Sequence, residues 1–288
     1  MSENVKSLLG RYGIAPKKKL GQSFLVNESI AQDIVNSAHL KKDDIVLEIG
    51  GGFGILTRCV ARSAGKVYVV EKEKALAAAL RSLLREYSNI EVIEGDAMSV
   101  GLPPANKVVA NLPYSISSPI TFRLLNEVRF HSAVLMYQKE FAERLLSPSG
   151  SRDYSRLTIE VTYRADVEKV RNVTAREFYP MPKVDSMVVR MIPRSSGPFA
   201  RDDRVFHWMI RGIYSYPNKQ IRKAFRIWFR GLGYDDEVSE KLTERCANHF
   251  TGTERLRDLN LEALVNLSNS ALEMIEDGML CDPRGNTA

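Results

Sequence analysis

Between residues 43 and 192, short apolar runs alternate with helical segments, and this alternation restricts the fold more than any other feature. The runs are continuous and rich in Val and Ile, as in strands that are buried on both faces. Chains with this alternation form mainly parallel sheets covered by helices on both faces. The sequence therefore predicts an α/β fold, with strands over residues 45–49, 66–70, 90–93, 107–110 and 133–137.

The later part of the chain has a different composition. Two runs rich in Thr and Val, residues 157–163 and 184–192, are predicted to close the sheet edge as an antiparallel pair. Residues 193–198 read PRSSGP, which is typical of a linker, and only helical patterns follow. We therefore predict one domain over residues 1–196 and a smaller all-helical domain over residues 197–288.

Residues 217–230 have a strongly amphipathic pattern and are predicted to form one helix of the second domain. The segment starts at a proline and ends before Gly231, and both residues are typical of helix ends. One predicted face is apolar and packs on the core, while the opposite face is basic and is either solvated or in contact with RNA. The apolar face carries Ile221, Phe225, Trp228 and Phe229, and the basic face carries Lys219, Arg222, Lys223, Arg226 and Arg230.

Composition excludes several classes of protein. The 288 residues contain no apolar run close to the roughly 20 residues that span a bilayer. The three cysteines are far apart and show no Cys-x-x-Cys spacing, so neither a disulfide framework nor a zinc site is expected. The N-terminus lacks the apolar core of a secretory signal. We predict a cytoplasmic protein without a membrane partner and without a metal.

The net charge of +6 is unevenly distributed. Residues 1–20 hold five Lys or Arg against one acid, and residues 199–230 hold eight against two. Residues 235–288 show the reverse, with twelve acids against five bases. Two segregated basic segments indicate a polyanionic partner.

A glycine loop follows the first predicted strand, in the sequence Glu-Ile-Gly-Gly-Gly-Phe-Gly over residues 48–54. Gly50 and Gly52 allow the backbone to approach a ligand closely, at the start of a helix. A dinucleotide-binding fingerprint would need Gly or Ala at Ile55. The loop is therefore predicted to bind a ligand without pyrophosphate contacts.

Two carboxylates follow the next two predicted strands. Glu71 lies about 20 residues past the glycines, where a carboxylate accepts hydrogen bonds from ribose hydroxyls. Asp96 is placed to accept one from the exocyclic amine of adenine. Either residue alone is more simply a helix cap, but together with the glycine loop they indicate a nucleoside ligand. A nucleoside without phosphates points to S-adenosylmethionine, and the spacing resembles that of class I methyltransferases with a Rossmann-like sheet.

The sequence Asn-Leu-Pro-Tyr, residues 111–114, ends the fourth predicted strand. The N6 amine of adenine is a poor nucleophile, and two acceptors aimed at its N–H bonds favour its reactive form. The Asn111 side chain and the Leu112 carbonyl are predicted to be those acceptors, and Tyr114 to stack on the extruded base. A turn that only terminates the strand is the alternative.

With residues 21–25, the glycine loop, residues 111–114 and residues 178–186 (FYPMPKVDS), the sequence resembles the KsgA family of ribosomal RNA adenine dimethyltransferases over residues 12–265. The resemblance implies two methylations on N6 of each of two adjacent adenosines. These lie in the hairpin near the 3′ end of small-subunit rRNA, within an assembling subunit. It also implies S-adenosylmethionine as cofactor, and we expect a monomer.

The resemblance assigns roles to further residues. The loop Gln22-Ser23-Phe24-Leu25 would cover the cofactor, with Ser23, which stands where the family commonly has Asn or His, and Leu25 in contact. Gly50 would approach its methionine part, Glu71 its ribose and Asp96 its adenine, and Asn111 would contact cofactor and substrate. Gly52 would also bind the cofactor. Phe178 would be the second aromatic wall around the base.

The predicted RNA contacts are Lys17, Lys18, Lys19, Lys183, Arg222, Lys223 and Arg226.

Three rival functions share parts of this pattern. The erythromycin-resistance methyltransferases of large-subunit rRNA have the same motifs in the first domain, but residues 182–186 and the second domain favour the KsgA family. A DNA adenine methyltransferase would need a large target-recognition insertion, which the chain lacks. An assembly or transcription factor that binds nucleic acid without catalysis would not need the Asn-Leu-Pro-Tyr motif together with Glu71 and Asp96.

Overall fold

The computed structural model describes residues 4–17 and 21–283, which form two compact units. The first unit combines Met1–Glu143 with Ala165–Pro193, and the second combines Arg144–Arg164 with Arg194–Ala288. Residues 144–164 therefore belong to the second unit, whereas the sequence analysis assigned them to the first domain. The physical reason is that Tyr154, Ile159 and Tyr163 are buried in the core of the second unit.

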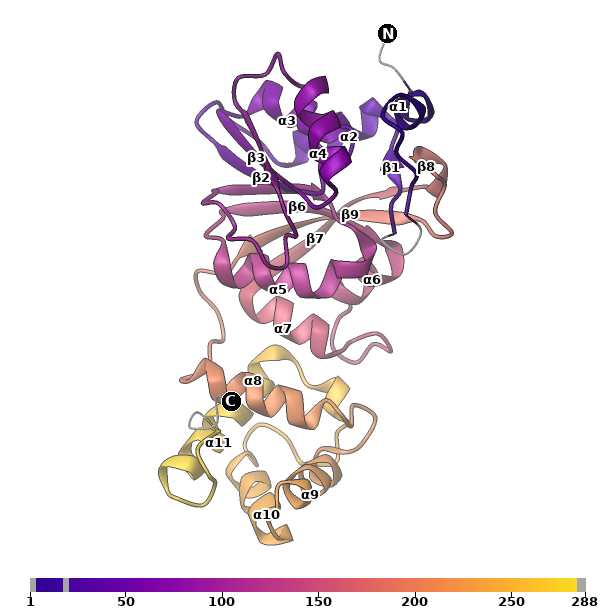
Figure 1. The fold of residues 1–288 in the computed structure, drawn as a ribbon. Coiled ribbons are helices and arrows are strands. Elements are labelled where there is room, and N and C mark those ends of the chain that lie inside the picture. Colours follow the sequence, from indigo (N-terminus) through magenta and orange to yellow (C-terminus); the bar gives the residue numbers. More distant parts are fainter. Residues whose placement is uncertain (1–3, 18–20, 284–288) are drawn as a thin grey trace. The chain divides into compact units, whose positions relative to one another are not determined.

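The first unit is built on a seven-stranded sheet with the order β4-β3-β2-β5-β6-β9-β7 (Figure 1). All pairs from β4 to β6 are parallel, and β9 is antiparallel to both of its neighbours. The five predicted parallel strands are confirmed. The strands are β2 (Ile45–Ile49), β3 (Lys66–Glu71), β4 (Ile90–Glu94), β5 (Lys107–Asn111), β6 (Ser132–Gln138), β7 (Ala165–Val173) and β9 (Ser186–Pro193).

The prediction of a strand over residues 157–163 is wrong, because this segment forms the helix α7 (Arg156–Arg164). Its Thr and Val residues favour a strand, but the side chains of Thr158 and Thr162 are used inside the helix. Thr158 accepts a hydrogen bond from the Ser155 amide (3.1 Å) at the start, and Thr162 donates to the Thr158 carbonyl (2.7 Å). The antiparallel partner of β9 is instead the next segment, β7.

Helices cover both faces of the sheet. α2, α3 and α4 lie on one face, where they share a core with the strands, and α5 lies on the other (Figure 1). A separate two-stranded antiparallel ribbon joins β1 (Phe24–Leu25) to β8 (Phe178–Tyr179). The helices of this unit are α1 (Val5–Arg11), α2 (Glu28–Ser37), α3 (Ile55–Ser63), α4 (Lys74–Leu83), α5 (Ser117–Glu127) and α6 (Lys139–Leu145), which runs into the second unit.

The second unit is helical, with a core rich in aromatic side chains. The predicted helix over residues 217–230 begins later, at Ile221, because the Ile221 amide bonds to the Glu254 carbonyl (2.9 Å) and Gln220 bridges to Arg255. Its predicted apolar face is buried as expected. Besides α7, the helices are α8 (Asp203–Ile213), α9 (Ile221–Gly231), α10 (Asp236–Arg245) and α11 (Leu261–Glu276).

None of the helices formed by residues 4–17 and 21–283 is both long enough and apolar enough to cross a membrane.

The glycine loop fits so tightly against β3 and α4 that a methyl group at Gly51 has no room. A Cβ there would lie 2.5 Å from Cγ1 of Val69 and 2.8 Å from Cδ2 of Leu80, both fully buried. We expect Gly51→Ala to lower the free energy of unfolding by about 1–3 kcal/mol, as overpacking of a dense core does. Gly101→Ala is the matched control, since nothing lies within 4 Å of its added Cβ. Equal unfolding midpoints in urea for the two variants would contradict this packing.

Candidate functional site

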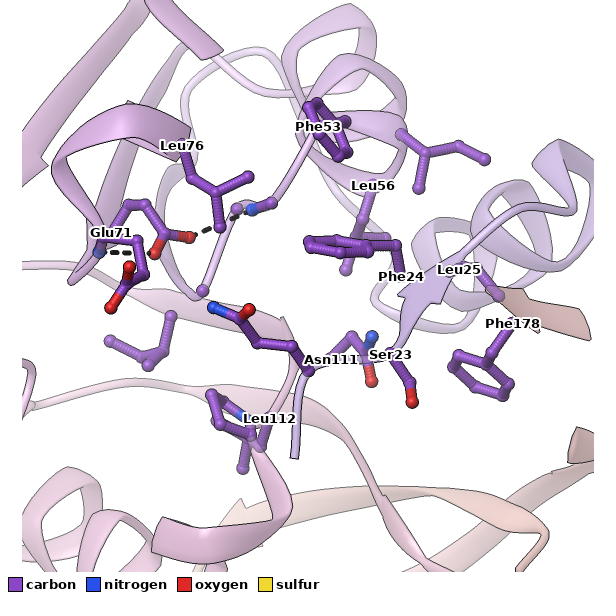
Figure 2. Close-up of a pocket in the computed structure, with 18 of the residues that line it drawn as sticks. Ser23, Phe24, Leu25, Phe53, Leu56, Glu71, Leu76, Asn111, Leu112 and Phe178 are labelled. Carbon is purple, nitrogen blue, oxygen red and sulfur yellow. Dashed lines mark hydrogen bonds between the residues drawn. The ribbon is translucent and has the colours of Figure 1, made fainter. Parts of the chain in front are cut away.

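A cavity of about 600 Å³ lies at the carboxyl ends of β2, β3, β4 and β5 (Figure 2). Ligands of open α/β sheets bind at this edge. The cavity is formed entirely by the first unit. Its lining contains every residue predicted to bind cofactor or act in catalysis, namely Gln22, Ser23, Leu25, Gly50, Gly52, Glu71, Asp96, Asn111, Leu112, Tyr114 and Phe178.

The backbone of the glycine loop forms one wall. Gly50 and Gly52 have positive φ angles of 78° and 55°, a conformation that side chains oppose. The Gly50 amide donates to the Val70 carbonyl (2.8 Å), which ties the loop to β3. A Cβ on Gly52 would lie 3.1 Å from the ring of Phe24. Positions 50 and 52 therefore favour glycine, and without side chains they let a ligand approach the backbone closely.

Glu71 is the last residue of β3, and its carboxylate is fixed by two backbone donors. Oε2 accepts from the Gly52 amide (3.1 Å) and Oε1 from the Glu73 amide (3.0 Å), as the dashed lines in Figure 2 show. Burial raises the pKa of Glu71, and these hydrogen bonds oppose that effect. Each oxygen retains a lone pair, so the carboxylate can accept from two neighbouring hydroxyl groups.

Asp96, in the loop after β4, is held as an ionised acceptor. Oδ2 accepts from Lys72 Nζ (2.7 Å) and Oδ1 from the Met98 amide (2.9 Å). The Lys72 ammonium holds the pKa of Asp96 below its usual range. Sequence analysis did not identify Lys72, which also lines the cavity.

Asn111 ends β5, and its side chain projects into the cavity (Figure 2). The next residue, Leu112, is buried, and its amide donates to the Met136 carbonyl (3.2 Å), which extends the pairing with β6. Pro113 then turns the chain (φ −58°, ψ 125°) into a short 3₁₀ turn that begins at Tyr114. The Tyr114 hydroxyl lies 2.7 Å from Ser186 Oγ, and burial raises the pKa of this phenol. The motif thus delivers an amide and an aromatic ring to one cavity.

Phe178 reaches the cavity from a later part of the first unit, on β8. It is buried on β8, where it pairs with Leu25 on β1, so both residues are placed by the same ribbon. The adjoining loop is braced by Gln22, whose Oε1 accepts from the Lys17 amide (2.8 Å). Ser23 lies between the ribbon and Asn111 (Figure 2).

Sequence analysis missed the helix α1 as part of the cavity, because it treated residues 1–20 only as a basic arm. Val5, Leu8 and Leu9 form a small core with apolar residues from β1, the glycine loop and α4. Val5 and Leu8 also line the cavity. The available signal was the spacing of these residues after Asn4, whose side chain caps the helix by accepting from the Ser7 amide (2.8 Å).

Glu48 is a second residue whose role was missed. It lines the cavity, is 1% exposed, and its Oε2 has no hydrogen-bond partner among the residues that the structure describes. Burial raises the pKa of Glu48 to about 8, and the nearby Glu71 adds to the shift. A buried carboxyl with a free oxygen suits a positively charged part of a ligand.

The predicted RNA contacts that the structure describes do not line this cavity. Lys17 forms an ion pair with Glu73, while Lys18 and Lys19 fall outside the described residues. Lys183 is exposed on the loop between β8 and β9. Arg222, Lys223 and Arg226 belong to α9 in the second unit, where Arg226 pairs with Asp236 (3.4 Å) and Glu240 (3.5 Å). Contact with RNA remains a prediction for all of these residues.

Among residues 4–17 and 21–283, no three His, Cys, Asp or Glu side chains are grouped so that they could hold a metal ion.

Comparison with known proteins gives consistent matches. A family model described as "Ribosomal RNA adenine dimethylase" matches residues 14–247. A protein of Methanopyrus kandleri named "Probable ribosomal RNA small subunit methyltransferase A" is 42% identical, over 84% of this chain and 89% of its own length. A protein of Thermococcus onnurineus with the same name is 47% identical, over 81% of this chain and 84% of its own.

Solved structures agree with the sequence matches. A dimethyladenosine transferase from Plasmodium falciparum superposes with a TM-score of 0.74 at 32% identity, covering 88% of this chain and 98% of that one. The 23S rRNA methyltransferase ErmE gives a TM-score of 0.65 at 27% identity, covering 86% and 98%. The fold is therefore that of a Rossmann-like methyltransferase with a C-terminal helical part.

The raised pKa of Glu48 predicts a pH-dependent stability. The folded protein keeps this proton up to about pH 8, whereas the unfolded chain loses it near its ordinary value of 4.5. The wild type therefore loses stability as pH rises through this window, because the unfolded state releases the proton first. Relative to wild type, we expect Glu48→Gln to gain about 3 kcal/mol in free energy of unfolding between pH 5 and pH 8.

Denaturant unfolding at pH 5, 6.5 and 8 measures this gain. Glu86→Gln, at an exposed carboxyl, is the control and should run parallel to wild type. A Glu48→Gln curve that is also parallel to wild type would show that Glu48 is ionised in the folded protein.

Proposed function

This chain belongs to the ribosomal RNA adenine dimethylase family, and from that premise we propose how its cavity works. The protein is an S-adenosylmethionine-dependent rRNA adenine dimethyltransferase. We propose that its substrates are two adjacent adenosines in the hairpin near the 3′ end of small-subunit rRNA. The observation that carries the proposal is that Asn111, at the end of β5, projects into the same cavity as the glycine loop, Glu71 and Asp96.

The residues of the cavity fit S-adenosylmethionine, which supplies a methyl group activated by a sulfonium. The fixed carboxylate of Glu71 suits the two ribose hydroxyls, and the acceptor Asp96 suits the adenine amine. Glu48 lines the cavity with an oxygen that has no hydrogen-bond partner among the described residues, and a cationic ligand beside it would favour its ionised form. Bare backbone at Gly50 and Gly52 leaves room for the methionine part.

Asn111 and Leu112 orient and activate the target amine. The Asn111 oxygen and the Leu112 carbonyl each accept from one N–H of N6, which favours the geometry in which the nitrogen lone pair is available. As the N–C bond forms and the C–S bond breaks, the nitrogen becomes an acidic ammonium and releases a proton. No strong general base is needed, and alignment of the reacting atoms supplies most of the rate.

Tyr114 and Phe178 are proposed as the two walls around the extruded base. Both line the cavity, one after β5 and the other on β8. An aromatic face on each side replaces the stacking that the base loses when it leaves the RNA.

The rest of the chain is proposed to hold the RNA. The first unit performs methyl transfer, and the basic residues of the arm and of α9 contact phosphates in an assembling small subunit, where charge adds affinity without reading sequence. We expect a monomer in the cytoplasm. The alternative is a factor that acts by nucleic-acid binding alone. Such a factor would not need Asn111, two carboxylates and the glycine loop gathered in one cavity.

Replacing Asn111 tests the central assignment. We expect Asn111→Ala to lower methyl transfer by about 100-fold or more, the usual cost of removing one preorganised polar group from a reacting centre. The assay follows label from S-adenosylmethionine into small ribosomal subunits that lack these methyl groups, with digestion of the product to separate mono- from dimethyladenosine. Binding to the subunits should change by less than about twofold, because phosphate contacts supply most of the affinity.

Asn172→Ala is the matched control, since this asparagine is exposed on β7. Equal transfer by wild type and Asn111→Ala would refute the role of Asn111. Wild-type protein that binds subunits but transfers no label would favour the binding-factor alternative.

A further inference from the structure

Ser186 is fixed in the sheet more firmly than its place next to a loop suggests. It is the first residue of β9, is fully buried, and pairs with Gln138 of β6 on one side and Val173 of β7 on the other. Its hydroxyl lies 2.7 Å from the hydroxyl of Tyr114. Tyr114 itself sits in a single 3₁₀ turn without a side-chain cap, so this hydrogen bond links its ring to the rigid sheet.

Asp185, the preceding residue, makes the corresponding link to Phe178. Its Oδ1 accepts from the Ala175 amide (2.9 Å) at the start of the 3₁₀ turn Ala175–Glu177. Thr174 precedes this turn and gives it no side-chain cap, so the carboxylate of another segment fills that role. The Ala175 carbonyl then accepts from the Phe178 amide. Two successive hydrogen bonds therefore connect Asp185 to Phe178.

Other contacts hold the same segments in the fold. Phe178 pairs with Leu25, and Glu177 accepts from Asn27 Nδ2 (2.8 Å). The Asp185 carbonyl accepts from the Lys139 amide (2.9 Å), independently of its side chain. Loss of the Asp185 carboxylate or the Ser186 hydroxyl should therefore shift the aromatic rings without unfolding the unit.

We propose that Asp185 and Ser186 are paired positioning residues that set the distance between the two aromatic walls of the base site. The inference rests on the proposed function, which gives Tyr114 and Phe178 that role. Because two consecutive residues at one end of β9 anchor both rings, the width and tilt of the slot depend on a single rigid point. Methyl transfer is sensitive to such placement, since small errors in the approach of reacting atoms cost large factors in rate.

Ser186→Ala and Tyr114→Phe remove the same hydrogen bond from its two ends. Each should lower the single-turnover rate of methyl transfer about fivefold to tenfold, as expected for one neutral hydrogen bond. The double variant should be no slower than the slower single variant, because both changes delete one interaction. Affinity for S-adenosylmethionine and for subunits should remain unchanged, so the loss falls on the chemical step.

Ser132→Ala is the matched control. Ser132 is also a buried serine on a neighbouring strand and accepts from Lys107 Nζ (3.1 Å), but it begins β6 at the opposite end of the sheet. Its variant should retain the wild-type rate, even where its stability falls as much as that of Ser186→Ala.

Asp185 is tested by two substitutions. Asp185→Ala removes the acceptor for the Ala175 amide and should lower the single-turnover rate about tenfold. Asp185→Asn keeps an oxygen in the same place and should stay within about twofold of wild type, since an amide oxygen also accepts from a backbone N–H.

The possible results separate this inference from the proposed function. A double variant slower by the product of the two single effects, a Ser132→Ala rate as low as that of Ser186→Ala, or an Asp185→Asn rate as low as that of Asp185→Ala would each overturn the positioning role. In these cases wild type still methylates rRNA. A wild type that transfers no methyl group overturns the proposed function, and the inference falls with it.

Discussion

Four neighbouring parallel strands, β4, β3, β2 and β5, end at the same edge of the sheet, and the cavity depends on this constraint. Each strand places one chemical group at its end: Asp96 after β4, Glu71 as the last residue of β3, the glycine loop after β2, and Asn111 as the last residue of β5. Residues spread over more than sixty positions of the sequence therefore meet in one place. Strand order and direction therefore fix the positions of these groups relative to one another.

The carboxyl groups of the cavity show how one edge can hold acids in different states. Asp96 is partly exposed and paired with Lys72, so it is an ionised acceptor. Glu71 is buried but receives two backbone hydrogen bonds, which limit the cost of its charge. Glu48 is buried, one of its oxygens has no hydrogen-bond partner among the described residues, and ionising it costs the most free energy of the three. A ligand with an amine, neutral hydroxyls and a positive charge would match Asp96, Glu71 and Glu48, respectively.

Sequence alone predicted what local chemistry determines, and missed what tertiary packing determines. The glycine loop, Glu71, Asp96 and Asn111 lie at the ends of the predicted strands and line one cavity, because strand ends carry their own turn signals. Their roles stay predictions. The helix α7 was predicted as a strand, since Thr and Val propensities were overruled by packing in the core of the second unit. The helix α1 was overlooked because its segment was interpreted from its basic residues, and the apolar residues Val5, Leu8 and Leu9 were not considered. The hydrogen bond between Tyr114 and Ser186 could not be predicted, because the two residues are 72 positions apart in the chain.

The antiparallel direction of β9 brings the start of this strand to the edge of the sheet where the cavity lies. A parallel strand in the place of β9 would have its carboxyl end, not its start, at the cavity. A crossover connection would also be needed between it and the preceding parallel strand. β9 runs the other way, so its first residue, Ser186, lies opposite Gln138 at the end of β6. The segment that runs from β8, which carries Phe178, to β9 therefore enters the sheet at the edge where the Asn111 motif leaves it. One reversal of strand direction thus brings a late segment of the first unit to the same edge as the four parallel strand ends, and lets two adjacent residues hold both rings.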